Sequence, residues 1–351
     1  MKKRISIVLM IFLLAVFFIS CSNTTKNEEQ ISKNDFLLDT VVSIKLYDVP
    51  QEDEILIDQS FKLISDLESI LSVHKEGSDL YKLKMNAGKA PVEVSHYTME
   101  VIKKSLEYSI KTDGKFDITA GPLIDLWAID PPNGYLPTNE EIITAVSNID
   151  FRNLIVDEIN STVYLAEEGM IANLGAIAKG YIADQVKSFL IENDVEHAII
   201  NLGGNVLLVG DKPDGSQFRI GVQDPDAARN TYIGVLVTSD TSVVSSGDYE
   251  RYFEKDGVKY HHILDPETGY PANNHIRQVS IVSETSVDGD ALSTTLFLLG
   301  LDKGIELINS MNGVEAIFVT DDNKIVVTEG LHDSFEFDET TYSDTYEIFY
   351  R

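Results

Sequence analysis

The stretch that decides the fold is residues 170–210, MIANLGAIAKGYIADQVKSFLIENDVEHAIINLGGNVLLVG. A short apolar run at 170–172 enters a glycine turn, and apolar residues then recur at helical spacing over 175–192. Residues 197–210 have the composition of a buried strand that is interrupted by two glycines at 203 and 204. The pattern predicts a strand, a tight turn, a helix and a second strand in succession.

Strand and helix patterns mix on both sides of this stretch. Strands are predicted at 36–47, at 153–165 (two short strands), at 278–283, at 315–320 and at 325–328. Helices are predicted at 55–71, 98–112, 288–299 and 303–311. A hairpin is predicted at 251–264, around the two-residue turn Asp256-Gly257. The order follows no strict βαβ rhythm and shows no long repeat, so it predicts an α+β fold.

Length, composition and charge exclude several classes of protein. The chain has 351 residues, 43% of them hydrophobic, which is enough for a sizeable core and excludes a disordered acidic chain. Its formal charge is −29, which argues against nucleic-acid binding, because that needs lysines and arginines to neutralise phosphates. An acidic protein that handles a phosphorylated ligand needs a metal cation, a helix N-terminus or backbone amides instead.

The N-terminus resembles a bacterial lipoprotein export signal. Three basic residues at 2–4 precede an apolar run at 5–19, and Ser20 precedes Cys21, the only cysteine. We expect a signal peptide at 1–20, lipidation of Cys21, a flexible polar tether at 21–34 and a folded domain at 35–351. The alternative is an ordinary signal peptide or an uncleaved anchor with a chance cysteine.

Residues 173–180, Asn-Leu-Gly-Ala-Ile-Ala-Lys-Gly, form the first candidate site. A helix that begins here would present free backbone N–H groups and its positive dipole end, and Lys179 would add a cation, an arrangement that suits a phosphate. The alternative is a glycine that only serves a tight turn between strand and helix.

Residues 288–294, Asp-Gly-Asp-Ala-Leu-Ser-Thr, form the second. Asp290 and Thr294 are four residues apart on a predicted helix, so their oxygens share a face, with Ser293 beside them. Such an oxygen-only set suits Mg²⁺. The alternative is that Asp288 or Asp290 caps the helix and Thr294 bonds back to a carbonyl.

Two further segments contain candidate side chains. Strand alternation places His261 and His262 on opposite faces, so one could be solvated while the other faces a cleft, and a histidine beside the tight turn at 265–269 could act as a general base. The alternative for either is a hydrogen-bonded structural histidine. In residues 113–127, Phe116 and the sole tryptophan, Trp127, could stack on a planar ligand or simply pack in the core.

Three runs carry a family resemblance: Ser-Gly-Asp-Tyr-Glu-Arg-Tyr-Phe at 246–253, His-His-Ile-Leu-Asp-Pro-Glu-Thr-Gly-Tyr-Pro at 261–271, and Asp-Ala-Leu-Ser-Thr at 290–294. With the segments at 113–127 and 173–180, they resemble the ApbE-type flavin transferases (FAD:protein FMN transferases) from about residue 35 to residue 328. The resemblance implies one large mixed α+β domain of the ApbE/T-fold-like type, with antiparallel-rich sheets and packed helices.

The resemblance also implies an activity. Such enzymes cleave the diphosphate of FAD with Mg²⁺, attach FMN through a phosphoester to a Thr or Ser of an acceptor protein, and release AMP. The metal ligands map onto the side chains of Asp290 and Thr294, the main-chain oxygen of Ala176, and Ser293. His262 falls on the histidine that activates the acceptor hydroxyl. Flavin and adenine contacts map onto Leu38, His74, Lys115, Phe116, Asp117, Asn173, Lys179 and Leu264.

The chain departs from the family pattern at three places. Leu38-Asp39-Thr40 stands where Met-Gly-Thr is common, His74 stands where an aromatic residue is common, and Asn173-Leu174-Gly175-Ala176 replaces Asp-Leu-Gly-Gly. A neutral Asn173 cannot act as a carboxylate, so its contact is expected to differ.

Two alternative functions stay open at this stage: an FAD pyrophosphatase that uses water, and a surface lipoprotein that only binds flavin. The resemblance and the export signal place the protein at the extracytoplasmic face of a bacterial cell membrane. Its expected acceptor is a membrane redox subunit or an extracytosolic flavoprotein.

Overall fold

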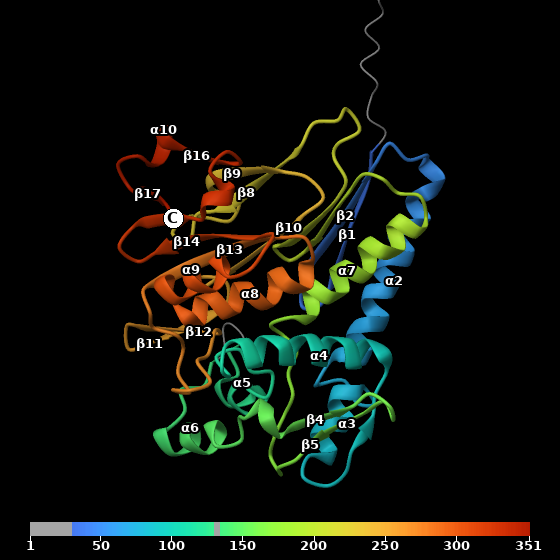
Figure 1. Ribbon diagram of the computed structural model, residues 1–351, viewed down its shortest axis with the longest axis vertical. Helices are drawn as coiled ribbons and strands as arrows, with labels where there is room; N and C mark the ends of the chain where they lie inside the picture. The colour runs from blue at the N-terminus through green and yellow to red at the C-terminus, as the bar shows by residue number, and fades with distance from the viewer. Residues whose placement is uncertain (1–29, 130–133) are drawn as a thin grey trace, which may run out of the picture.

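A nine-stranded sheet forms the centre of the molecule in the computed structural model, which describes residues 30–129 and 134–351 (Figure 1). Its strand order is β1-β2-β6-β7-β10-β13-β14-β15-β17, and every neighbouring pair is antiparallel except β15 and β17. The strands are β1 (Gln30–Leu37), β2 (Thr40–Tyr47), β6 (Ala198–Leu202), β7 (Asn205–Val209), β10 (Ser242–Gly247), β13 (Ile276–Ser283), β14 (Val314–Thr320), β15 (Lys324–Val327) and β17 (Glu347–Tyr350).

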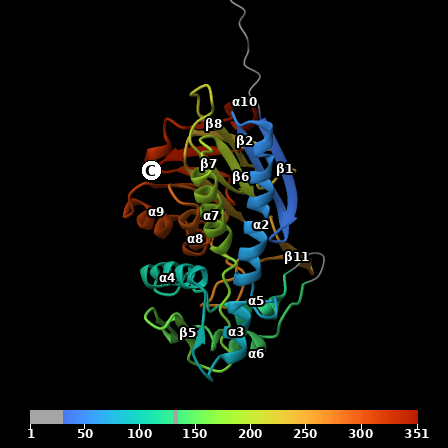
Figure 2. The same ribbon diagram turned by 90° about the vertical axis from the view of Figure 1, so that its right-hand side faces the viewer.

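Helices cover one face of this sheet, and a small sheet covers part of the other. The helices are α2 (Glu54–Leu71), α7 (Ala178–Glu192), α8 (Ser286–Leu299) and α9 (Leu301–Asn309), as Figure 2 shows from the side. The small sheet contains β8 (Phe218–Gln223), β9 (Tyr232–Thr238) and β16 (Phe335–Phe337). Strand β14 shows the division: Ala316 and Phe318 belong to the helix-side core, and Ile317 and Val319 to the opposite core.

The remaining elements lie mainly below the central sheet in Figure 1. They are α3 (Asp79–Asn86), β3 (Val92–Glu93), α4 (His96–Lys111), α5 (Gly121–Trp127), α6 (Asn139–Val146), β4 (Leu154–Asp157), β5 (Thr162–Leu165), and the separate hairpin of β11 (Tyr252–Lys255) and β12 (Val258–His261). Short 3-10 turns η1 (Gln51–Asp53), η2 (Phe151–Asn153) and η3 (Glu329–Leu331), and the helix α10 (Glu339–Tyr342), complete the described chain. The segment between β12 and β13 therefore runs between the sheet and this lower group of helices.

The α+β prediction is confirmed, and so are most of the predicted helices and the hairpin around Asp256-Gly257. The single strand predicted at 36–47 is wrong, because the chain turns at Leu38 and Asp39, whose φ angles are 54° and 56°. Positive φ at both central residues is what a tight two-residue hairpin turn requires. The strand predicted at 197–210 is likewise two strands, joined at Gly203-Gly204.

The predicted signal peptide and the lipidated Cys21 lie outside the described residues. Residues 30–34 of the predicted tether are described: they belong to β1 and pair with β2, so the folded domain begins earlier than residue 35. Within 30–129 and 134–351, no helix has the length and apolar content needed to cross a membrane.

Candidate active site

Asp290 lies at the meeting point of two helix starts. Its side chain is buried, with the residue only 4% exposed. The backbone N–H of Gly180, in the first turn of α7, donates to Asp290 Oδ2 at 2.9 Å. The ammonium of Lys179 lies 3.6 Å from Oδ1. The structure therefore brings together two candidate segments, 173–180 and 288–294, that are more than a hundred residues apart.

The acidic residues of α8 are not caps of their own helix. Asp288 accepts from the Tyr108 hydroxyl at 2.5 Å and pairs with Lys104 at 2.7 Å, which connects α8 to α4. Thr294 does not bond back to a carbonyl among the described residues, whereas its neighbour Thr295 does. The capping alternative therefore does not account for Asp290 and Thr294.

The donor chemistry of Asp290, Thr294 and Ala176 suits a hard divalent cation. Because the N–H of Gly180 is directed to Asp290, the Ala176 carbonyl receives no backbone donor in the described chain. The Thr294 hydroxyl likewise has no hydrogen-bond partner there. Ser293 is already engaged, because its hydroxyl lies 2.7 Å from Ser246 Oγ and donates to the Asp290 carbonyl at 2.9 Å. One carboxylate, a free hydroxyl and a free carbonyl are ligands that Mg²⁺ accepts.

No cluster of three or more His, Cys, Asp or Glu side chains able to hold a metal occurs in the described part of the chain. The set around Asp290 has only one such side chain, so it is a different kind of site. A cation there would keep waters or ligand phosphate oxygens in its remaining positions.

His262 is held in a defined orientation by one carbonyl. The Arg251 oxygen accepts from the His262 backbone N–H at 3.0 Å and lies 3.2 Å from the ring Nδ1. Because a carbonyl only accepts, Nδ1 carries the proton and Nε2 keeps its lone pair. Loss of solvation, with a smaller effect from His261, lowers the pKa of His262 to about 3. The ring is therefore neutral at physiological pH and can accept a proton at Nε2.

His261, on the opposite face of the strand, has a structural environment. Its Nε2 lies 2.9 Å from the Ala272 carbonyl, and its Nδ1 accepts from the Ile263 N–H at 3.3 Å. Its ring packs edge-on against Phe297 of α8, with 5.6 Å between ring centroids. Both ring nitrogens of His261 are thus engaged by backbone groups, whereas His262 Nε2 has no hydrogen-bond partner in the described part of the chain.

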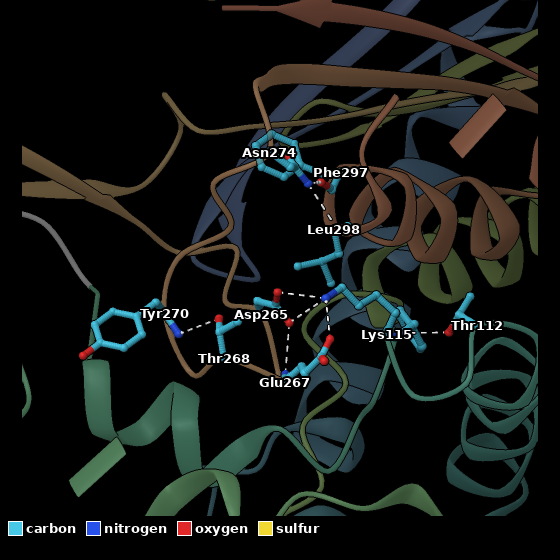
Figure 3. A network of polar contacts seen from close by, with 10 residues as sticks. Thr112, Lys115, Asp265, Glu267, Thr268, Tyr270, Asn274, Phe297 and Leu298 are labelled. Atoms are coloured by element: carbon cyan, nitrogen blue, oxygen red, sulfur yellow. Dashed lines mark hydrogen bonds and ion pairs between the residues drawn. The ribbon is translucent and has the colours of Figure 1, made fainter. Parts of the chain in front are cut away.

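Lys115 joins the histidine segment to the lower helices (Figure 3). Its ammonium donates to both oxygens of Asp265, at 2.8 and 2.9 Å, and reaches Glu267 at 3.3 Å. Asp265 precedes the turn that follows His262, and its own backbone N–H is bonded to Tyr270. In this structure Lys115 orders that turn, and the expected flavin contact stays a prediction.

The other residues mapped to flavin contacts have varied surroundings. The Phe116 ring is 2% exposed and packs against Tyr108 at 6.0 Å, so in this structure it belongs to the core and cannot stack on a ligand. Leu264 is buried in the cluster that contains Trp127, whose ring is therefore also core. The Asp117 carboxylate accepts from Thr119 and from the Phe151 N–H, and burial raises its pKa.

Three further mapped residues lie on turns. Asn173 accepts from the Gly175 N–H at 2.8 Å, an amide role that needs no carboxylate. Leu38 is at the β1–β2 turn, and His74 is exposed in the loop after α2. Both are accessible to a ligand without rearrangement of the core.

Sequence reasoning missed several residues that hold these segments in place. Ser246 contacts Ser293, and the Tyr249 hydroxyl donates to Gln278 at 2.5 Å. Asp184 accepts two backbone N–H groups at the start of α8, at 2.8 Å each. None of these pairs is signalled by spacing along the chain, because each joins two elements that only tertiary folding brings together.

Comparisons with known proteins identify the family of this chain. The model of the ApbE family matches residues 38–318. A FAD:protein FMN transferase of Klebsiella pneumoniae is 38% identical to this chain, in an alignment that covers 83% of this chain and 90% of the relative. A FAD:protein FMN transferase of Treponema pallidum is 32% identical, over 90% of this chain and 91% of the relative. The ApbE crystal structure from Thermotoga maritima superimposes with a TM-score of 0.78, at 32% identity, over 91% of this chain and 100% of its own. This chain belongs to the ApbE family.

Proposed function

We propose that the protein transfers FMN from FAD to a Thr or Ser hydroxyl of an acceptor protein. The acceptor oxygen forms a bond to the phosphorus of the FMN half, the bond to the bridging diphosphate oxygen breaks, and AMP leaves with that oxygen. The hydroxyl proton passes to His262. The observation that carries the proposal is the His262 ring, whose Nδ1 is fixed on the Arg251 carbonyl while Nε2 is left as a base.

His262 would accept the proton as the new bond forms. An imidazole is a far weaker base than the alkoxide of Thr or Ser, so it does not remove the hydroxyl proton in advance, and proton acceptance accompanies formation of the phosphorus–oxygen bond. Holding the hydroxyl, the ring and the phosphorus in one arrangement supplies much of the rate enhancement. The Lys115–Asp265 ion pair supports this arrangement by ordering the turn next to His262.

We assign the cation expected for this reaction to the oxygens of Asp290, Thr294 and Ala176, with Ser293 beside them. Bound Mg²⁺ would polarise the diphosphate and neutralise charge that develops on its oxygens. Asp290 provides the anionic ligand, and the start of α7, with Lys179, provides a further positive environment for a phosphate. Leu38, His74, Asp117 and Asn173 are proposed to contact the flavin or adenine around this point.

Hydrolysis of FAD by the same site is the main competitor, because water could replace the acceptor hydroxyl at His262. A second part of the proposal is cellular: the N-terminal signal supports lipidation of Cys21 and a position at the extracytoplasmic face of the membrane. The acceptor would then be a membrane redox subunit or an extracytosolic flavoprotein.

The proposal is tested by incubating the purified protein, without its signal peptide, with FAD, Mg²⁺ and a cell-envelope fraction. In-gel flavin fluorescence of an acceptor band is expected. Release of AMP with no labelled band would favour the hydrolase, and neither product would favour a flavin-binding protein. Omission of Mg²⁺ in a parallel reaction tests the cation separately.

A further inference from the structure

Helices α7 and α8 exchange backbone caps at their starts. The residue before α7, Ile177, makes no side-chain cap, and the Gly180 N–H is instead satisfied by Asp290 of α8. The residue before α8, Thr285, also makes no side-chain cap, and the N–H groups of Ser286 and Val287 are satisfied by Asp184 of α7. Each helix start is thus capped by a carboxylate from the other helix.

The two caps fix one register between the helices. Gly180 of α7 is bonded to Asp290 of α8, and Asp184, one turn later in α7, is bonded to Ser286, one turn earlier in α8. The helices are therefore antiparallel here and are held at two points one helical turn apart. The backbones also approach closely, because a Cβ at position 180 would lie 2.2 Å from the Ser286 carbonyl oxygen.

The Asp184 cap is bidentate. Oδ1 accepts from Ser286 and Oδ2 from Val287, each at 2.8 Å, so the carboxylate is oriented as well as placed. The same α8 turn is held from the sheet side, because the Ser286 hydroxyl contacts Asn205 at 2.5 Å and Ser242 at 3.0 Å. The start of α8 consequently has little freedom to slide or rotate against α7.

We propose that Asp184 is a positioning residue for the cation site. The site takes its carbonyl from the segment that enters α7, at Ala176, and its side chains from α8, at Asp290 and Thr294. The register between the helices sets the separation of these oxygens, and outside the site Asp184 provides the carboxylate that links α7 directly to the start of α8. This role rests on the proposed function, since it presumes that the oxygens bind Mg²⁺.

The test is the affinity for Mg²⁺, measured by titration calorimetry on the purified protein with no acceptor present. Asp184→Asn keeps the shape of the side chain but replaces one accepting oxygen by an NH2 group, so one of the two N–H groups, of Ser286 or of Val287, loses its acceptor. We expect about 10- to 100-fold weaker Mg²⁺ binding, the range found when groups that orient metal ligands are changed. Asp184→Glu, which keeps both acceptors on a longer stem, is expected to be intermediate.

Asp79→Asn is the matched control. Asp79 is also buried and also caps another helix start, because it accepts from the Ser95 N–H at 2.7 Å and the Thr98 hydroxyl at 2.9 Å at the start of α4. It should lose stability without a change in Mg²⁺ affinity. Thermal unfolding with and without Mg²⁺ provides a second measurement, since the shift in Tm reports binding to the folded variant.

Unchanged Mg²⁺ affinity in folded Asp184→Asn would overturn the positioning role while leaving the proposed function intact. An equal loss of affinity in Asp79→Asn would also overturn it, because the effect would then be a general consequence of destabilisation. A wild-type protein that binds no Mg²⁺ would overturn both the cation assignment and this role.

Discussion

Replacing Gly180 by alanine should destabilise the protein, although alanine is the better helix former. In an exposed helix interior the change from glycine to alanine stabilises by about 1 kcal/mol. At position 180, however, the new Cβ would lie 2.2 Å from the Ser286 oxygen, 2.6 Å from the Ser286 carbonyl carbon and 2.7 Å from Asp290 Cβ. Two of these atoms are backbone, so α7 and α8 must move apart rather than rotate a side chain.

The cost can be worked from these contacts. Overpacking of this kind typically costs about 1–3 kcal/mol. Separation of the helices also stretches the Gly180 N–H bond to the buried Asp290 carboxylate, and a hydrogen bond to a charged group contributes about 1.5–3 kcal/mol. After the gain of about 1 kcal/mol in helix propensity is subtracted from these costs, we expect the free energy of unfolding to fall by about 2–4 kcal/mol. Mg²⁺ binding should also weaken.

Urea unfolding of the wild type and Gly180→Ala, each with and without Mg²⁺, measures both effects. Gly304→Ala is the control, because the three atoms nearest to a Cβ at this helical glycine belong to side chains: two ring atoms of Phe318 at 3.0 Å and Leu296 Cβ at 3.7 Å, so a shift of a few tenths of an ångström relieves the contact. It should change the free energy of unfolding by less than about 1 kcal/mol. A Gly180→Ala protein as stable as the wild type, with unchanged Mg²⁺ affinity, would refute the close-approach reasoning.

Four further predictions follow from the site. Asp290→Ala should abolish Mg²⁺-dependent flavin transfer, and full activity in that variant would exclude Asp290 as the cation ligand. His262→Ala should bind FAD as the wild type does, in an equilibrium titration, but lose transfer by roughly 10²–10⁴-fold; a variant that also fails to bind FAD would make His262 structural. Lys115→Met should lower transfer at unchanged Mg²⁺ affinity, because the Asp265 turn next to His262 loses its ion pair; an unchanged rate would leave that pair without a functional role. Asp184 gives a pH prediction. Burial, reinforced by Asp288 and opposed by Lys187 and by the two N–H bonds, raises its pKa to about 6. Because the pKa of Asp184 is higher in the folded than in the unfolded state, the wild type loses stability as the pH rises towards 6, whereas Asp184→Asn cannot titrate at this position. The free energy of unfolding of the wild type minus that of Asp184→Asn should therefore fall by about 2–3 kcal/mol between pH 4 and 7. A difference that does not change with pH would contradict this.

Most helices and the hairpin around Asp256-Gly257 could be predicted from sequence, but the pairing of strands in the central sheet could not. Apolar periodicity placed α2, α4, α8 and α9 within a few residues of their observed ends. It missed the turn at Leu38-Asp39, because neither residue is one that ordinarily favours positive φ as strongly as glycine. It also missed the small sheet of β8, β9 and β16, in which β8 and β9 are consecutive strands and β16 joins them from about a hundred residues further along the chain.

The site shows the same limit. Spacing alone suggested that Asp290 and Thr294 share a face, and the family resemblance added Ala176. Neither could reveal that Gly180 donates to Asp290 or that Asp184 caps α8, because these contacts depend on how two helices pack. The resemblance selected His262 over His261, but it could not reveal that the Arg251 carbonyl, which lies across a hairpin, orients the His262 ring.

The most direct measurement of the central claim is the stoichiometry of AMP release against covalent flavin in one reaction. Purified protein, FAD, Mg²⁺ and an acceptor protein are incubated together, AMP is quantified, and the modified Thr or Ser is located by mass spectrometry. One AMP is expected for each FMN phosphoester formed, and both products should be lost in His262→Ala. AMP released while the acceptor stays unmodified would contradict this expectation.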